Sequence, residues 1–164
     1  GKDMITERRN GFSVRIKGGT EFYFNNIDEA LIQEAVIMFD KEYFSSIPTL
    51  AGNLNERERV REKVRAEGNF PAEMVSSVNK EGNPNAYIYL SEIFNLRNLI
   101  HNVYLSNADT VESEEQVKTE FLRTVFTGKL LKVAKMVERW GGKGAFRRIG
   151  DITKRDRGII ENQK

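Results

Sequence analysis

The chain has 164 residues, of which 39% are hydrophobic and 30% charged, so it has enough apolar material for a core and is not a disordered segment. It contains no cysteine, which excludes disulfide scaffolds, thiolate zinc sites, iron–sulfur clusters and cysteine nucleophiles. The net charge of +2 is unevenly distributed, since residues 129–164 hold eleven Lys or Arg and four Asp or Glu, whereas residues 1–128 hold fifteen and twenty.

No apolar run approaches the roughly 20 residues that cross a bilayer, so we expect no membrane contact and a cytoplasmic or host-cell intracellular location. The element pattern predicts an α+β fold that is predominantly helical, with five or six helices and a small N-terminal β-hairpin. We expect a flexible N-terminus over 1–10, a globular domain over 11–142, and a basic C-terminal tail or docking segment over 143–164 that includes a strand or a short docking element.

The hairpin is predicted from apolar residues that alternate with polar ones over 12–17, a glycine pair at 18–19 and a returning strand over 21–24.

Its register has two alternatives. A two-residue turn pairs Ile16 with Glu21 and mixes polar and apolar side chains on both faces. A three-residue loop pairs Ile16 with Phe22 and Val14 with Phe24, which leaves one apolar face. We therefore expect the second register.

Two helices of different character follow the hairpin. The apolar arc of the helix predicted over 27–44 is too wide for a surface helix, so we expect it to be the central core helix. Pro48 ends it. The helix predicted over 54–67 is highly charged, with a thin apolar stripe and ion pairs at i,i+3 such as Glu58–Arg61.

Further helices are predicted towards the C-terminus. Pro71 opens a short helix that runs to Lys80. The next helix is predicted over 86–105, with a strand at its start as the alternative. Ser113 begins a helix that Gly128 splits in two, and the glycine pair at 141–142 stops it.

The residues that could carry catalysis have simpler structural explanations. His101 is the single histidine, and we expect a hydrogen-bonded imidazole there. The acids and lysine over 109–118 fall at a predicted helix start, where acids favour the helix dipole. The Ser77-x-x-Lys80 spacing has no companion motif. The glycine-rich segment 141–144 follows a helix, unlike a phosphate-binding loop, and is expected to be a helix stop and hinge. We expect no cofactor and no metal, and an enzyme is poorly supported.

The basic end gives the strongest functional signal. Its first four cations recur at three- and four-residue spacing, so they share one helical face, and later cations surround one aromatic residue. Lys and Arg neutralise phosphates, and an aromatic side chain can stack on an unpaired base. The candidate nucleic-acid-binding residues are Lys129, Lys132, Lys135, Arg139, Lys143, Phe146, Arg147, Arg148, Lys154, Arg155 and Arg157.

We therefore hypothesise a non-enzymatic nucleic-acid-binding module that contacts RNA or DNA phosphate backbones through this basic C-terminal surface. The alternative is a protein-interaction or assembly subunit of a larger complex, for example a viral one. Its basic tail would then dock on an acidic protein surface or on other copies of the chain. The alternative is open because helices are often basic near their C-termini, where cations suit the dipole.

Overall fold

The structure, a computed structural model, describes residues 9–15, 21–43, 46–47, 51–68, 71–153 and 155–156. The fold is α+β and predominantly helical, as the sequence predicted. The helices are α1 (Asn25–Tyr43), α2 (Ala51–Glu67), α3 (Leu90–Asn107), α4 (Glu114–Thr127), α5 (Leu131–Gly141) and α6 (Ala145–Ile152), with a 3-10 turn, η3, at Ala72–Met74. The strands are β1 (Arg9–Asn10), β2 (Ser13–Arg15), β3 (Glu21–Tyr23), β4 (Val75–Val78), β5 (Pro84–Ala86) and β6 (Arg155–Asp156).

Contacts divide the chain into two compact units. Unit 1 contains residues 1–32 and 92–164, and unit 2 contains residues 33–91. One boundary falls inside α1 and the other close to the start of α3, where the sequence predicted no boundary. Within the described ranges, no helix is both long enough and apolar enough to cross a membrane.

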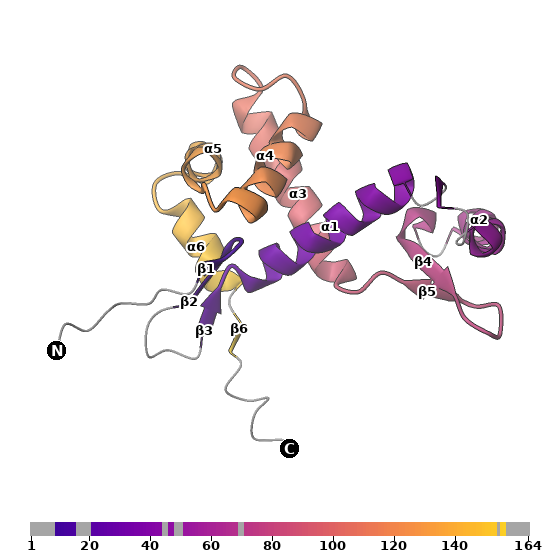
Figure 1. Ribbon diagram of the computed structural model, residues 1–164. Helices are drawn as coiled ribbons and strands as arrows, with labels where there is room; N and C mark the ends of the chain where they lie inside the picture. The colour runs from indigo at the N-terminus through magenta and orange to yellow at the C-terminus, as the bar shows by residue number, and fades with distance from the viewer. Residues whose placement is uncertain are drawn as a thin grey trace. The chain divides into compact units, whose positions relative to one another are not determined.

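Unit 1 contains an antiparallel sheet with the strand order β1-β2-β3-β6 (Figure 1). The predicted hairpin is present, but the preferred register is wrong, because Val14 pairs with Tyr23 and Arg15 with Phe22. Phe24, the expected partner of Val14, adopts a left-handed φ of 60° and lies beyond the end of the strand. Its ring therefore reaches the core without following the strand alternation. Ile16 and the predicted loop lie outside the described residues.

Residues near both ends of the chain take part in the sheet of unit 1. Strand β1 pairs with β2, so the last two residues of the expected flexible N-terminus belong to the sheet. Residues 1–8 lie outside the described part. Towards the C-terminus, residues 145–152 form helix α6, which the sequence did not predict. A strand, one of the two elements expected within 143–164, is present as β6 and pairs with β3.

An aromatic cluster forms part of the unit 1 core. Phe12 is fully buried, and its ring stacks on Phe121 with centroids 5.9 Å apart. Phe24 lies 4.7 Å from Phe146 on α6, so this cluster joins β2, α4 and α6. The helices add further buried side chains, which include Ile93, Leu96, Ile100, Val103, Val117, Val133, Met136 and Val137.

The sequence predicted the ends of α4 and α5 correctly. The Ser113 hydroxyl accepts a hydrogen bond from the Gln116 amide, which caps α4. Gly128 takes a left-handed conformation after Thr127 and separates α4 from α5, and α5 ends at Gly141.

In unit 2, α2 packs on η3 and on the β4–β5 hairpin. Val64, Ala72 and Val75 form its apolar cluster. The helix predicted over 71–80 is wrong, because Val75 begins a strand that pairs with β5. The helix predicted from 86 begins at Leu90, because Ala86 pairs with Val75 and Tyr89 has a φ of 60°.

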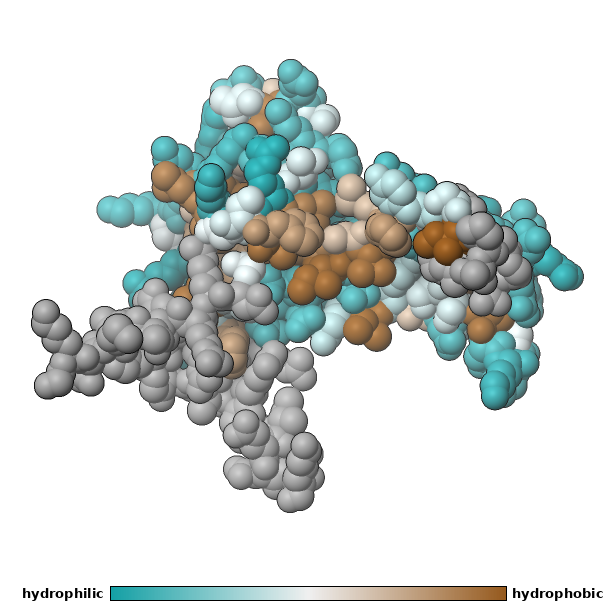
Figure 2. All heavy atoms as spheres, in the orientation of Figure 1, coloured by the Kyte–Doolittle hydropathy of each residue, from teal (hydrophilic) through white to brown (hydrophobic). Residues whose placement is uncertain are grey.

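Helix α1 is present as predicted, but its whole apolar arc does not lie in the core. Val36, Phe39 and Tyr43 are 43%, 53% and 49% exposed, and Figure 2 shows apolar side chains gathered over this helix. Its buried side includes the acids Glu34 and Asp40 as well as apolar residues. Hydrophobic spacing therefore identified the helix and its buried residues Ile27, Ala30 and Leu31, but it placed too wide an apolar arc in the core.

Candidate nucleic-acid interface

Helix α5 separates apolar from basic side chains. Val133 and Val137 are buried, whereas Lys132, Lys135 and Arg139 are exposed. Residues three and four apart lie on the same side of an α-helix, so the spacing alone produces this separation. The helix thus attaches to the core through one side and presents cations on the other.

Two of these cations are engaged in ion pairs with other elements. Lys132 Nζ lies 2.8 Å from an oxygen of Glu120 on α4. Arg139 Nη2 lies 2.6 Å from Asp109 Oδ2, and this hydrogen bond holds the pKa of the Asp109 carboxyl below its usual value. These two cations are therefore partly neutralised.

Four other cations among the candidate nucleic-acid-binding residues have no ion pair within the described residues: Lys129, Lys135, Lys143 and Arg147. All four are exposed. Together with the two paired cations and Arg148, they form what we call the basic surface: Lys129, Lys132, Lys135, Arg139, Lys143, Arg147 and Arg148. The acidic residues among positions 129–151 are Glu138 and Asp151.

Side chains on both helices hold the turn that joins α5 to α6. The Glu138 carboxylate accepts hydrogen bonds from the backbone amides of Gly144 and Phe146, the latter at 3.0 Å. Arg148 donates in the opposite direction, to the carbonyls of Gly141 at 2.8 Å and Lys143 at 3.1 Å. Arg148 is therefore partly structural, and Glu138 is a helix cap that sequence reasoning missed. Glu138 lies inside α5, six residues before Gly144, so no local capping pattern marks it in the sequence.

The remaining candidate nucleic-acid-binding residues are not part of the basic surface. Phe146 is half-buried, and its ring packs against Phe12 and Phe24, so the aromatic cluster holds it. Arg155 contributes its backbone to β6, where it pairs with Phe22. Lys154 and Arg157 lie outside the described residues.

The other motifs do not come together as a reaction centre. His101 is exposed, and its Nδ1 lies 2.8 Å from Glu114 Oε2. Ser77 lies on β4 and accepts a hydrogen bond from the Asn85 amide. Among the residues that the structure describes, no group of three or more acids and histidine could hold a metal ion.

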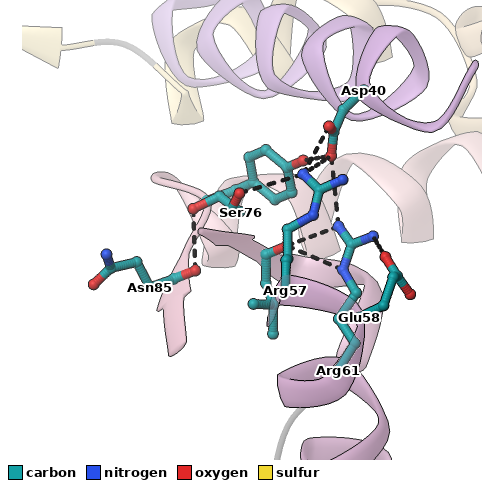
Figure 3. A network of polar contacts seen from close by, with 8 residues as sticks. Asp40, Arg57, Glu58, Arg61, Ser76 and Asn85 are labelled. Carbon is teal, nitrogen blue, oxygen red and sulfur yellow. Dashed lines mark hydrogen bonds and ion pairs between the residues drawn. The ribbon is translucent and has the colours of Figure 1, made fainter. Parts of the chain in front are cut away.

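A second polar cluster lies within unit 2 (Figure 3). Arg57 on α2 donates to both oxygens of Asp40 on α1, at 2.7 and 2.8 Å. Arg61 approaches Asp40 at 3.5 Å and donates to the Val75 carbonyl at 2.7 Å. The Tyr87 hydroxyl also donates to Asp40. Burial and this hydrogen bond raise the pKa of Tyr87 to about 12.

The sequence did not predict this cluster, because the charged pattern of α2 indicates a solvated helix. In addition, Asp40 lies 17 residues before its partner Arg57 in the chain. A surface hollow of about 600 Å³ lies beside it, and both cations and acids line that hollow. The Asp40 carboxylate accepts hydrogen bonds from Arg57 and Arg61, and Arg61 also donates to the Val75 carbonyl on β4. The cluster therefore ties α1, α2 and β4 together within unit 2.

Comparison with known protein families, with curated proteins and with solved structures finds no match to this chain.

Proposed function

We propose that the chain binds nucleic acid through the basic surface. The observation that carries the proposal is that Lys129, Lys135, Lys143 and Arg147 are exposed, within 19 residues of chain, and have no ion pair among the described residues. A cation without a protein partner can bind a phosphate without first giving up an ion pair. Each such contact releases condensed counterions from the nucleic acid, which favours binding at low salt.

Titration of fluorescently labelled nucleic acid at several salt concentrations tests the proposal. We expect tight binding that weakens steeply with salt. The variants Lys135→Ala and Lys143→Ala should each weaken binding and lower the magnitude of the log–log salt slope by about 1. The matched control is Lys63→Ala with Lys80→Ala, which removes two exposed cations from unit 2 and should leave the slope unchanged.

Point variants are preferable to deletion of residues 143–164. The deletion would remove Phe146 from its contacts with Phe12 and Phe24, so lost binding could reflect a damaged core. No binding of any nucleic acid at low salt would overturn the proposal. Oligomers that form without nucleic acid in the same samples, measured by sedimentation, would favour the assembly alternative.

A further inference from the structure

A short turn that contains two glycines joins the two helices that carry most of the basic surface. Helix α5 ends at Gly141 and α6 begins at Ala145, so three residues, 142–144, make the turn. Gly142 and Gly144 have φ values of 76° and 82°, which residues with a side chain rarely adopt. In Figure 1, α5 is seen end-on while α6 runs across the view, so the helix axes point in clearly different directions. A short glycine-containing turn between two steeply crossing helices is typical of a helix-turn-helix unit.

The turn is held in one geometry. Glu138 accepts hydrogen bonds from amides at the start of α6, and Arg148 donates to carbonyls at the end of α5. The helices also approach closely, because a Cβ added at Gly141 would lie 2.7 Å from the Cβ of Ala145. Contacts from both helices therefore fix the direction of α6 relative to α5.

One side of α6 faces the core and the other faces solvent. Ala145 and Gly150 are buried, and Phe146 packs on Phe24. Arg147 and Asp151, one turn apart, are exposed. Arg147 makes no hydrogen bond or ion pair within the described residues, unlike its neighbour Arg148. The exposed side of α6 thus offers one arginine whose guanidinium is not used by the fold.

We propose that α5 and α6 form a helix-turn-helix unit that places α6 in the major groove of duplex DNA, with Arg147 reaching base edges. This inference rests on the proposed function and names its substrate. In such units the second helix enters the groove, its N-terminal residues contact bases, and the first helix crosses the backbone. Lys135 on α5 and Lys143 in the turn are then the phosphate contacts.

Dimensions and chemistry favour duplex DNA over other nucleic acids. An α-helix with its side chains is about 10–12 Å in diameter, so α6 can enter the major groove of B-form DNA, which is about 12 Å wide. Duplex RNA has a deep, narrow major groove that side chains cannot read. Single strands are usually bound through aromatic stacking. Phe146, the aromatic residue of α6, is packed on Phe12 and Phe24. Trp140 on α5 is 40% exposed, and the single-strand titration below tests whether it stacks on a base.

The first experiment compares duplex DNA, duplex RNA of the same sequence and each single strand in one titration series with the full chain. We expect duplex DNA to bind at least tenfold more tightly than duplex RNA. Equal or tighter binding of RNA or of single strands overturns the duplex-DNA inference but leaves the proposed function standing. Absence of binding to all of them overturns both.

The second experiment selects binding sites from duplex DNA with a randomised central region. The wild-type chain should enrich a preferred sequence, and Arg147→Ala should lose preference at one position, with roughly tenfold less discrimination there. Lys135→Ala should weaken binding to all sequences alike. An unchanged preference in Arg147→Ala overturns the assignment of Arg147. Because that side chain is exposed and makes no hydrogen bond or ion pair within the described residues, circular dichroism of the variant should match that of the wild type.

Discussion

Gly150 lies directly against the ring of Phe24. A Cβ added at position 150 would come within 2.6 Å of two ring carbons of Phe24, and the Phe24 amide donates a hydrogen bond to the Gly150 carbonyl at 3.3 Å. Contacts this short leave no room for a methyl group. The absence of a side chain at position 150 therefore allows α6 to pack on the β3–α1 junction.

Gly150→Ala should destabilise unit 1, since the ring of Phe24 would have to move within a filled core. We expect a loss of about 1–3 kcal/mol in the free energy of unfolding, measured by urea denaturation with Trp140 fluorescence. Asp151→Ala, at the exposed neighbouring position of α6, is the control and should change stability by less than about 0.5 kcal/mol. Equal stability of the Gly150→Ala variant would contradict the tight packing.

The elements that the sequence predicted well are those with local signals. Ser113 caps α4 and Gly128 ends it, and both interactions involve residues at most four positions away. The short helix predicted after Pro71 failed because Val75 pairs with Ala86 and packs near Val64, contacts that are distant in sequence. Tertiary pairing there outweighed local propensity.

In the candidate interface, too, the local features could be predicted from the sequence and the contacts between distant residues could not. The cations over 129–148 are visible in the sequence, and so is the spacing that places the cations of α5 on one side. Their partners are not, because Asp109 and Glu120 belong to other parts of the fold. The glycines at 144 and 150 disfavour a helix locally, so α6 depends on the Glu138 cap and on contacts with Phe24 and could not be predicted.

Glu138→Ala should loosen α6, because the amides of Gly144 and Phe146 lose their acceptor. The expected cost is about 1 kcal/mol of stability, together with weaker binding of nucleic acid despite the loss of a negative charge. Glu138→Gln keeps one acceptor oxygen and should recover part of both. Amide hydrogen exchange over 144–148 and fluorescence titration measure the two effects. Tighter binding in Glu138→Ala would mean that charge, not the turn, decides.

Asp40→Asn should destabilise unit 2 strongly. Arg57 is buried and would lose its carboxylate partner, and breaking a buried pair by removing one charge costs about 3–5 kcal/mol. Faster hydrogen exchange of the amides in α2 and β4 is the readout. The control is Glu58→Gln, which removes an ion pair to Arg61 that is half-exposed on the acid side and should cost at most about 1 kcal/mol.

Tyr87 makes stability depend on pH in alkaline solution. Its pKa is raised from 10.0 to about 12 in the folded chain, so the unfolded chain ionises first. The stabilisation is fully present below pH 10 and is lost as the pH rises from 10 through about 12. Urea midpoints measured across this range should fall more steeply for the wild type than for Tyr87→Phe. Parallel curves would show that Tyr87 does not titrate differently in the two states.

The division of the chain into units has a consequence for how it is made. Unit 2 is continuous over 33–91, whereas unit 1 needs residues from both sides of it. During synthesis on a ribosome, unit 2 is complete once Ser91 has emerged, because domains generally fold as units. Phe12 and Phe24 must wait for Phe121 and Phe146, the ring partners that arrive about a hundred residues later. The nascent chain therefore carries these two aromatic side chains unburied through most of its translation, which is when a chaperone would meet them.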